Sequence, residues 1–494
     1  MSELHTEDVD VLVIGGGPAG MAAGTTTAAA GLRTLLVEQR TTLGGQVYRQ
    51  RPAGVPTGGP GQAHRAAGAR RDAAYAAAGG LRRTGCTVWD LAADHAMLTG
   101  PHGAVRVTFR AAVVAAGAFD LPVPFPGWTL SGVLTAGGAH ALMVGQGISP
   151  GRRVVLAGTG PLLIAFAADM VRAGVDIAGV FDPAPALTLR HMLAVAAVGS
   201  RTAAGRHTLW EGAGHLAVLR RAGVRITPET VLVRAEGDQE VSAVVLATAA
   251  PDFSPVLWTE RTVEADAVCV GYGFRPSTEL LDIAGCPSDG SGADRRPVLD
   301  AAGRTPVSGI YAAGDGVVPE GSTVAEASGL LTGAAVLEDL AVAGPDRRSL
   351  RRARAARDNA RRVRAAMDRG RTPAAGMPDL STDSTLLCRC ESVSRATVTA
   401  AIAGGARTPD AVKAVTRAGM GACQGRNCEL AICAQLAAVP RPEQAGAGFR
   451  RRPPARPVPL SQLVQQDQQQ DPDRNVVTGQ GSETPVDRGR TRAV

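Results

Sequence analysis

The chain has 494 residues, of which 45% are hydrophobic, so it is long enough to form about three folded domains. Its net charge of +7 has a local origin, because residues 346–371 hold eleven arginines and three aspartates while the rest of the chain is nearly neutral. The N-terminus lacks the apolar core of a secretory signal, and glycines and prolines interrupt the long uncharged stretch, so we expect neither a secretory signal nor a membrane span. We therefore expect a globular cytoplasmic protein.

The first chemical motif opens the chain. Val9–Ile14 is a β-branched run that is typical of a buried parallel strand. It leads into a Gly-x-Gly-x-x-Gly motif at Gly15, Gly17 and Gly20. In such a motif the first glycine permits a tight turn, the second lets a pyrophosphate approach the backbone, and the third lets the following helix pack closely on the sheet.

The residues that follow this motif favour a bound dinucleotide. Pro18 precedes a helix predicted over Ala19–Ala30, whose N-terminal N–H groups and positive dipole end would face a diphosphate. A second strand, Thr34–Val37, leads to Glu38, at the position where an acidic side chain holds a ribose hydroxyl. A glycine-rich turn without a ligand is the alternative, and the strand–helix–strand context favours the dinucleotide site.

The rest of the first half adds one more candidate loop. Gly44 and Gly45 leave room for a flat ring or a ribityl chain, and Gln46 can hydrogen-bond a heterocycle; a plain flexible loop is the alternative. Further predicted elements are a helix over Gln62–Gly79, strands over Thr87–Leu91 and Val105–Phe109, and a buried strand over Ala112–Gly117 that ends at the candidate residue Gly117.

A second strand–helix–strand unit repeats the opening pattern in part. Leu163 stands where the third glycine would be, so the fingerprint is incomplete and wider helix–strand packing is expected. Two interpretations stay open: NAD(P) or another adenine nucleotide binds here, or the domain keeps this fold without a ligand. The predicted parts are a strand that begins at Arg152, the motif residues Gly158 and Gly160, a helix over Pro161–Ala173, and a strand over Asp176–Phe181 that ends at Asp182.

The chain then completes the second domain and returns to the first. Near its end a short apolar strand leads to Gly314 and Asp315. Glycine permits a close approach there, and the carboxylate can accept hydrogen bonds from the hydroxyls of a sugar-like chain. The other predicted elements are helices near Ala186–Val198 and Leu209–Ala222, strands near Val231–Ala235, Val241–Ala247 and Val263–Gly273, and a helix over Thr323–Ala341.

The arginine-rich segment, residues 346–371, is predicted to be an amphipathic helix. Apolar and small residues recur at helical spacings beneath the arginines, at Leu350, Ala353, Ala360, Val363 and Met367. The arginines then form a solvated face of a connector helix, and we expect no nucleic-acid partner.

Five of the eight cysteines lie between residues 388 and 433, and no two cysteines have the Cys-x-x-Cys spacing of a redox-active disulfide. Two short predicted helices separate Cys388 and Cys390 from Cys423 and Cys428, so the two pairs should meet at one end of a helical module. Four thiols in a cytoplasmic protein favour a metal over disulfides. A [2Fe–2S] cluster fits this spacing better than zinc, which remains an alternative together with no metal, and Cys433 is expected to be a core cysteine.

These motifs carry a family resemblance. Residues 9–345 resemble the two-dinucleotide-domain flavoproteins, through the Gly15–Gly20 motif, Glu38 and Gly314–Asp315. The spacing of the four cysteines resembles the bacterioferritin-associated-ferredoxin-like [2Fe–2S] domain. Together with the loop at 44–46 and the Phe-Pro-Gly-Trp sequence at 125–128, the chain resembles the large (alpha) subunits of opine oxidases, hydrogen cyanide synthases and dye-linked proline or hydroxyproline dehydrogenases.

The resemblance implies an oxidoreductase that contains FAD and a [2Fe–2S] cluster and acts on CH–NH donors. In that group a separate FAD-containing beta subunit, similar to amino-acid oxidases, oxidises an amino acid or opine, and the large subunit carries the electrons away; a small ferredoxin-like subunit is a further expected partner. A stand-alone NAD(P)H-dependent flavoprotein reductase is the alternative function. An iron–sulfur scaffold or nucleic-acid-binding regulator is a rival from another class. No catalytic acid or base is identified.

The predicted fold is α/β, with two Rossmann-like dinucleotide-binding domains, the first of them discontinuous, and a small C-terminal helical [2Fe–2S] domain. The expected divisions are an FAD-binding domain at 1–150 and 265–345, a second dinucleotide-binding-like domain at 151–264, an Arg-rich helical connector at 346–380, the cluster domain at 381–440, and a Pro/Gln-rich tail at 441–494. The tail is too polar to bury a core and is expected to be disordered.

Overall fold

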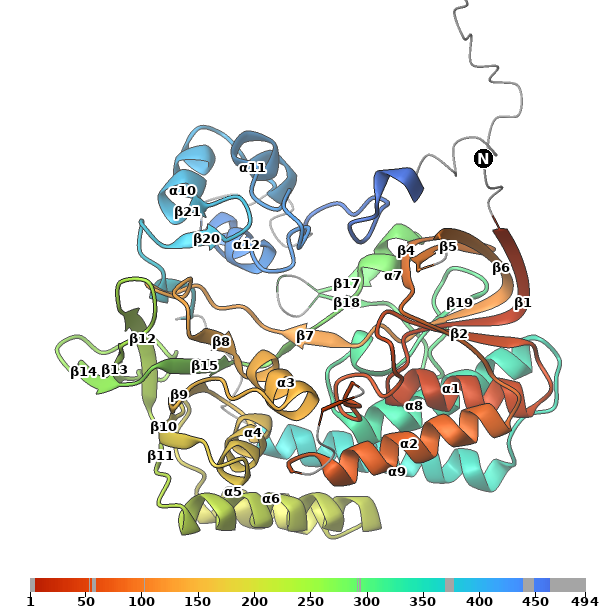
Figure 1. The fold of residues 1–494 in the computed structure, drawn as a ribbon, viewed down its shortest axis with the longest axis horizontal. Helices are drawn as coiled ribbons and strands as arrows, with labels where there is room; N and C mark the ends of the chain where they lie inside the picture. The colour runs from red at the N-terminus through yellow and green to blue at the C-terminus, as the bar shows by residue number, and fades with distance from the viewer. Residues whose placement is uncertain are drawn as a thin grey trace, which may run out of the picture.

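The computed structural model describes residues 5–52, 54–55, 59–101, 103–290, 292, 295–368, 377–438 and 448–462. Two α/β units lie side by side, and a small helical domain packs above them (Figure 1). This arrangement confirms the predicted fold class. Among the described helices, none is both long and apolar enough to cross a membrane.

The first unit is built on a seven-stranded sheet. Its elements are β1 (His5–Ile14), α1 (Pro18–Ala29), β2 (Thr34–Glu38), α2 (Gln62–Ala77), β3 (Leu81–Thr84), β4 (Thr87–Leu91), β5 (His95–Gly100), β6 (Gly103–Val114), β19 (Ile310–Ala312) and α8 (Ser322–Asp339). The order is β3–β2–β1–β6–β5–β4, with β19 also pairing with β6. β1, β2, β3, β6 and β19 pair in parallel, whereas β4 and β5 continue the sheet as an antiparallel meander. Helices α1 and α8 pack on each other, so the return of the chain completes the first unit.

Two predicted strands of this sheet are in fact one. Strand β6 contains the predicted strand Val105–Phe109 and the first part of the predicted strand Ala112–Gly117. It runs unbroken alongside β1, whose His5 pairs with Val105 at one end and whose Ile14 pairs with Val114 at the other. Strand β5 was not predicted, since its sequence lacks the regular alternation of β-branched residues.

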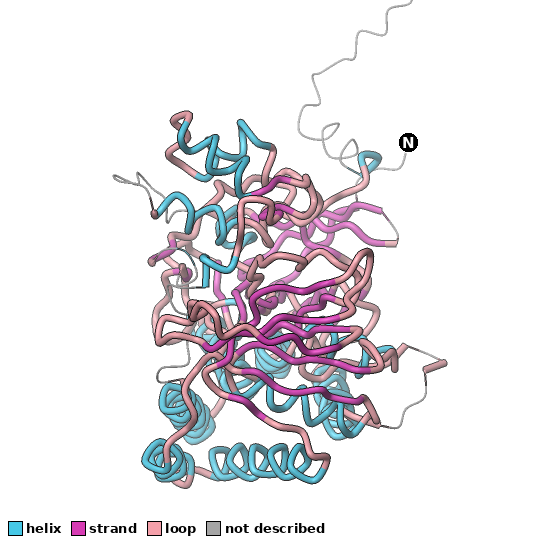
Figure 2. The backbone as a smooth tube through the Cα atoms, turned by 90° about the vertical axis from the view of Figure 1, so that its left-hand side faces the viewer, coloured by secondary structure: helices cyan, strands magenta, loops and turns pink. Residues whose placement is uncertain are grey.

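The second unit contains a five-stranded parallel sheet, ordered β11–β10–β9–β15–β8, and a three-stranded antiparallel sheet. Its elements are β8 (Val133–Thr135), α3 (Ala136–Gln146), β9 (Arg153–Gly158), α4 (Pro161–Arg172), β10 (Asp176–Phe181), α5 (Leu189–Gly199), α6 (Ala203–Arg221), β11 (Ile226–Thr227), β12 (Thr230–Glu236), β13 (Ala243–Thr248), β14 (Arg261–Glu264) and β15 (Ala267–Gly271). Figure 2 shows the strands stacked above helices that lie along the lower edge of the molecule.

Strand pairing makes the second unit longer than the predicted 151–264. Both β8 and α3 precede residue 151, and β15 follows residue 264, yet β15 pairs with β9 on one side and with β8 on the other. The chain passes between the units at β7 (Ala118–Asp120) and β16 (Phe274–Pro276), which pair antiparallel.

The arginine-rich segment forms helix α9 (Arg347–Met367). The Asp346 carboxylate caps it by accepting hydrogen bonds from the N–H groups of Arg348 (2.7 Å) and Ser349 (2.9 Å). Val363 is buried on the inner face and Arg351 lies exposed on the outer face, as the amphipathic pattern predicts. The helix packs on α8, α5 and α6. The last part of the predicted connector, residues 369–376, lies outside the described residues.

The C-terminal helical domain has its own small core and is joined to the first unit by the segment that follows it. It contains β20 (Leu386–Cys388), β21 (Val393–Ser394), α10 (Arg395–Ala403), α11 (Pro409–Thr416) and α12 (Glu429–Ala437). The predicted tail is packed over 448–455: Phe449 is buried in the domain's core, and the N–H of Ala455 donates to the Trp89 carbonyl at 2.7 Å. Residues 439–447 and 463–494 of the predicted cluster domain and tail lie outside the described residues.

Candidate functional site

The opening glycines form the tight turn between β1 and α1. Gly15 has a φ of 107°, and a Cβ at this position would overlap the Ala115 carbonyl at the end of β6. A Cβ at Gly20 would overlap the carbonyl of Gly15. Both positions therefore require glycine for packing within the protein.

The middle glycine of the motif has a different surrounding. A Cβ at Gly17 would meet only the Cα of Gly45, at 3.9 Å, so the space in front of Gly17 is open to a ligand. Among the described side chains, none caps the N-terminus of α1, and Pro18 occupies a position where its missing N–H costs nothing. The remaining N–H groups of the first turn can thus face an anion, as a diphosphate site requires.

The predicted loop at 43–49 folds directly onto this turn. The N–H of Gly44 donates to the Gly16 carbonyl at 2.8 Å. Gln46 accepts a hydrogen bond from the Arg49 guanidinium, and burial together with the nearby Arg40 lowers the pKa of Arg49 to about 10. Sequence reasoning missed Arg40; its position two residues after the candidate acidic residue Glu38 was the available signal.

Glu38 ends β2 with its carboxylate turned toward the glycine turn. The side chain is buried, and its two oxygens accept hydrogen bonds from the N–H of Gly16 (2.8 Å) and the N–H of Arg40 (3.0 Å). A carboxylate can accept about four hydrogen bonds, so capacity remains for a ribose hydroxyl. The carboxylate is thus fixed in the place that the motif predicts.

The Gly314–Asp315 turn lies over the start of α1. A Cβ at Gly314 would lie 2.6 Å from the Cβ of Ala19, so this close approach requires glycine. One Asp315 oxygen accepts hydrogen bonds from the N–H groups of Glu320 (3.0 Å) and Gly321 (3.1 Å). Burial raises the pKa of Asp315, and these two hydrogen bonds partly offset that effect.

Gly117 joins the same cluster of backbone turns. It follows β6, and a Cβ on Gly316 would lie 3.2 Å from the Gly117 nitrogen. The structure therefore brings together the predicted FAD residues from four separate segments of the sequence, at 15–20, 38–46, 117 and 314–315.

The second motif also joins a strand to a helix through two glycines, but its middle glycine, Gly160, has a φ of 99°, whereas Gly17 has a φ of −77°. A Cβ at Gly158 would overlap the Gly271 carbonyl, whereas Gly160 has open space around it. The missing third glycine is compensated on the partner strand, because a Cβ at Gly271 would lie 3.2 Å from the side chain of Leu163. Asp182 is buried, and its carboxylate accepts a hydrogen bond from the N–H of Ala184 at 2.9 Å.

The cleft in front of α4 is almost filled. It has a volume of about 20 Å³, lined among others by Gly160, Thr159 and Arg364 of α9; this is room for about one water molecule. The buried Thr159 hydroxyl has no hydrogen-bond partner among the described residues. The Arg364 guanidinium pairs with Asp368.

The four predicted cluster cysteines come together as two pairs of neighbouring thiols, Cys388 with Cys428 and Cys390 with Cys423, and the Cys428 thiol donates to the Gly425 carbonyl. The Cys428 thiol lowers the pKa of Cys388 to about 6, aided by backbone N–H groups that include that of Gly419, while burial opposes the shift. Cys388 and Cys428 are buried, and Cys390 is exposed.

The surroundings of these thiols fit an iron–sulfur cluster. Backbone N–H groups of Gly419, Glu391 and Cys390 point at the Cys388 sulfur, and such hydrogen bonds stabilise thiolates and tune the potential of a cluster. A Cβ at Gly421 would overlap the Cys390 side chain, so this loop must approach the thiols closely. In the described part of the chain, no three or more His, Cys, Asp or Glu side chains are already placed as the ligands of a metal ion. The two cysteine pairs nevertheless supply the four thiols that a [2Fe–2S] cluster needs.

Cys433 lies apart from this set. It is buried on α12, where burial raises its pKa to about 12 and keeps it a neutral thiol. This position agrees with the expected core cysteine.

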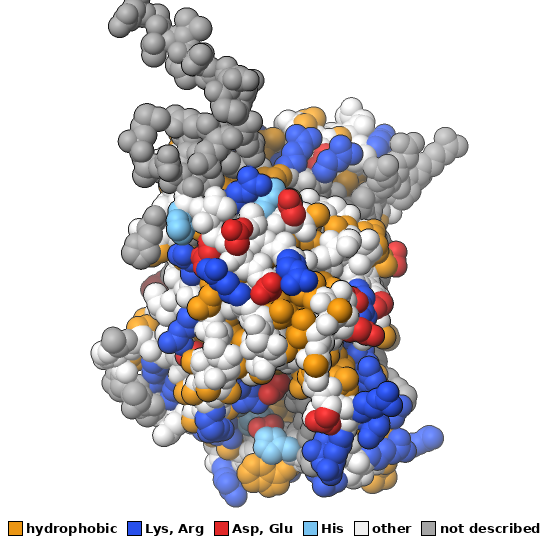
Figure 3. Space-filling model, turned by 90° about the vertical axis from the view of Figure 1, so that its right-hand side faces the viewer, with side chains coloured by type: hydrophobic (Ala, Val, Ile, Leu, Met, Phe, Trp, Pro, Cys, Tyr) orange, Lys and Arg blue, Asp and Glu red, His pale blue; other side chains and the backbone are white. Residues whose placement is uncertain are grey.

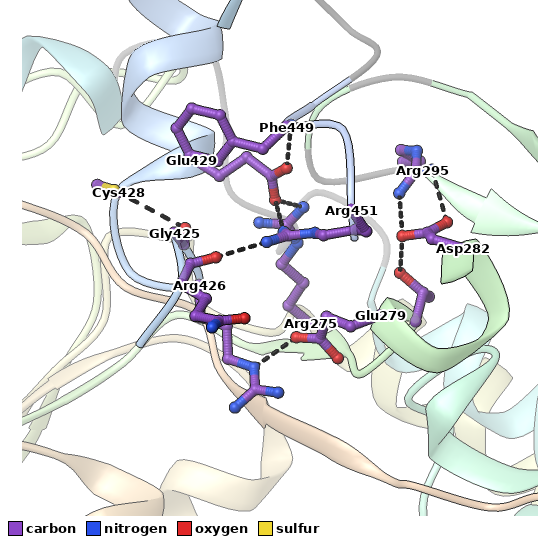
Figure 4. A network of polar contacts seen from close by, with 12 residues as sticks. Arg275, Glu279, Asp282, Arg295, Gly425, Arg426, Cys428, Glu429, Phe449 and Arg451 are labelled. Atoms are coloured by element: carbon purple, nitrogen blue, oxygen red, sulfur yellow. Dashed lines mark hydrogen bonds and ion pairs between the residues drawn. The ribbon is translucent and has the colours of Figure 1, made fainter. Parts of the chain in front are cut away.

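A buried ionic network fixes the cluster domain on the first unit (Figure 4). Glu429, which is 1% exposed, lies between Arg275 of β16 and Arg451 of the C-terminal segment and pairs with both. It also accepts a hydrogen bond from the Phe449 N–H at 2.6 Å. A second pair joins Arg426 of the cluster loop to Glu279 on α7 (Glu279–Ile283). Sequence reasoning missed this network, since its members are far apart in the chain.

Comparison with known proteins agrees with this geometry. Residues 9–329 match the family model described as "Pyridine nucleotide-disulphide oxidoreductase", and residues 386–438 match the "BFD-like [2Fe-2S] binding domain". The chain is 34% identical over 485 residues to an opine oxidase subunit of Agrobacterium tumefaciens, and the match covers 92% of this chain and 91% of the relative. It is 30% identical over 467 residues to hydrogen cyanide synthase subunit HcnB of Pseudomonas protegens, with coverage of 93% and 98%.

A solved structure shares the fold. L-proline dehydrogenase from P. horikoshii superposes with a TM-score of 0.65 at 20% identity, over 94% of this chain and 81% of that one. The resemblance predicted from the motifs is therefore confirmed.

Proposed function

Because this chain belongs to the pyridine nucleotide-disulphide oxidoreductase family and also contains a BFD-like [2Fe–2S] domain, we propose that it is the electron-transferring subunit of a complex that oxidises an amino acid or opine. The chain is a flavin and [2Fe–2S] oxidoreductase. The observation that carries the proposal is the pairing of the four cysteines in a domain that is held against the first α/β unit by the ion pair of Glu429 with Arg275.

The chain's own groups would hold the two cofactors. Bound FAD would supply two-electron chemistry and a bound [2Fe–2S] cluster one-electron transfer. The first-turn N–H groups of α1 would bind the diphosphate beside Gly17, Glu38 would accept from a ribose hydroxyl, and Asp315 from the ribityl chain. The buried Cys388 and Cys428 and the more accessible Cys390 and Cys423 would be the thiolate ligands.

The relatives are named as subunits, so a partner subunit is part of this proposal. Following the family resemblance of the sequence, we propose that this partner itself contains FAD, resembles amino-acid oxidases and oxidises the CH–NH substrate. A small ferredoxin-like subunit is a further candidate partner. All eight cysteines are free, which suits a reducing, cytoplasmic location.

A stand-alone NAD(P)H-dependent reductase is the second candidate, and one observation favours it. The unpartnered Thr159 hydroxyl and the uncapped α4 behind Gly160 offer a donor and an anion site to a nucleotide phosphate. Against it, the cleft of about 20 Å³ would have to open by displacement of Arg364.

Anaerobic reduction separates the two candidates. The full chain, purified alone and with its co-expressed partner subunit, is mixed with NADH, NADPH or candidate amino acids and opines while flavin absorbance is followed. We expect substrate to reduce the flavin only when the partner is present, and NAD(P)H to reduce it slowly or not at all. Rapid reduction by NAD(P)H without a partner would favour the stand-alone reductase.

A further inference from the structure

Helix α5 exposes an apolar face. Leu189, Met192 and Leu193 are 67%, 50% and 60% exposed, and they lie on one side of the helix because they are spaced by three and four residues. Ala196 and Ala197 continue this side and are also exposed. On the neighbouring helix α6, Trp210 is 75% exposed.

The composition of α5 is that of a buried helix. Its inner side, which includes Ala194, Val195 and Val198, is half-buried and also apolar, so the helix is apolar nearly all round. Helices of that kind are normally covered on every side. In α5 only Gly199 is fully buried, so one apolar side is left uncovered by the described chain. Exposed apolar patches of this kind mark interaction surfaces.

Arginines border this apolar surface. Leu189–Arg221 contains five arginines and a single acidic residue, Glu211. Helix α9, which packs against both α5 and α6, contains nine arginines and a single acidic residue, Asp358. Figures 1 and 2 place α5 and α6 along the lower edge of the molecule, and in Figure 3 Lys and Arg side chains gather on the lower part of the face shown.

We propose that the α5–α6 surface, bordered by α9, docks the substrate-oxidising subunit of the complex, through an apolar patch rimmed by Asp and Glu on that subunit. This inference rests on the proposed function, which requires such a subunit. Trp, Met and Arg are enriched at protein interfaces, and all three are present here. A second copy of this chain does not fit, because symmetric pairing would bring the same arginine-rich helices against each other.

The test uses two single variants of the full chain, Leu193→Asp and Trp210→Glu, each of which places a charge in the apolar surface. Trp258→Glu is the matched control, because Trp258 is 98% exposed on the loop between β13 and β14, away from this helix pair. Each tagged variant is expressed with the other subunits, and bound FAD, iron and the substrate-oxidising subunit that co-purifies are quantified. That subunit, purified, is then titrated onto each variant in sedimentation velocity at low and high salt.

We expect both surface variants to keep FAD and iron but to bind the subunit about tenfold or more weakly, with Trp258→Glu unchanged. Binding to the wild type should also weaken at high salt, because the arginine rim contributes. A complex that survives both substitutions overturns the docking proposal alone. The docking proposal is also overturned if the two substitutions weaken only self-association of the chain, or only its binding to vesicles of phosphatidylcholine and phosphatidylglycerol. Absence of any substrate-oxidising subunit with the wild type would overturn the proposed function as well.

Discussion

The indole N–H of Trp128 donates a 2.7 Å hydrogen bond to the carbonyl of Leu386, in the strand that ends at the first cluster cysteine. The guanidinium of Arg389, between Cys388 and Cys390, lies 5.1 Å from the centre of the same indole ring. The Phe-Pro-Gly-Trp sequence at 125–128 therefore contacts strand β20 and the loop that follows it, which contain Cys388 and Cys390.

The first prediction concerns this contact. Trp128→Phe keeps a ring under Arg389 but leaves the Leu386 carbonyl without its donor, which should cost about 1–3 kcal/mol locally. We expect iron to be retained less well and the EPR signal of the reduced cluster to change, while FAD stays bound. Trp258→Phe, at a fully exposed tryptophan, is the control and should match the wild type. Identical EPR spectra and iron contents in the two variants would contradict the predicted role.

The second prediction tests the FAD site. A Cβ at Gly17 would meet nothing in the protein closer than 3.9 Å, so we expect the branched side chain of Gly17→Val to obstruct mainly the bound diphosphate. Asp315→Ala should remove a ribityl contact. Both variants should purify folded and with iron, but with less flavin per chain, measured by absorbance after denaturation. Full FAD occupancy in both would reject the assignment.

The third prediction concerns the attachment of the cluster domain. Glu429→Ala leaves Arg275 and Arg451 buried without their shared carboxylate, and removal of one partner from a buried ionic group costs about 3–5 kcal/mol. Chemical denaturation should show this loss of stability. Glu260→Gln, which removes an exposed partner of Arg234, is the control and should change the free energy of unfolding by about 0–1 kcal/mol. Equal effects of the two substitutions would show that the network is not structural.

The fourth prediction concerns helix α9. Reversing the charge of the exposed Arg351 and Arg354 should leave the fold and the flavin content unchanged, with a cost below about 0.5 kcal/mol for each. Thermal melts and flavin absorbance check this. Loss of folded protein would mean that these arginines are needed inside the chain.

Local sequence patterns predicted the parts of the site that depend on local backbone geometry. Gly15 and Gly20 are needed within the turn that they form, and the caps at Ser394 and Thr408 begin the two helices that separate the cysteine pairs. What the sequence could not indicate depends on contacts between distant segments.

Three cases show this. Leu163 is tolerated in the second motif because Gly271, on another strand, makes room for it. Arg364 enters the second cleft only because α9 packs across the second unit. Phe449 belongs to the core of the cluster domain although it follows a Pro- and Arg-rich boundary in the sequence.

The cluster itself is the most direct test of the electron-transfer account. Serine variants of Cys388, Cys390, Cys423, Cys428 and Cys433 are purified anaerobically, and iron, zinc, FAD and the EPR spectrum after reduction are measured for each. We expect the wild type and Cys433→Ser to hold about two iron atoms per chain and to give the signal of a reduced [2Fe–2S] cluster. Each of the other four variants should lose both iron and signal while keeping FAD. One equivalent of zinc without iron in the wild type, or an intact signal in any of those four variants, would contradict the account.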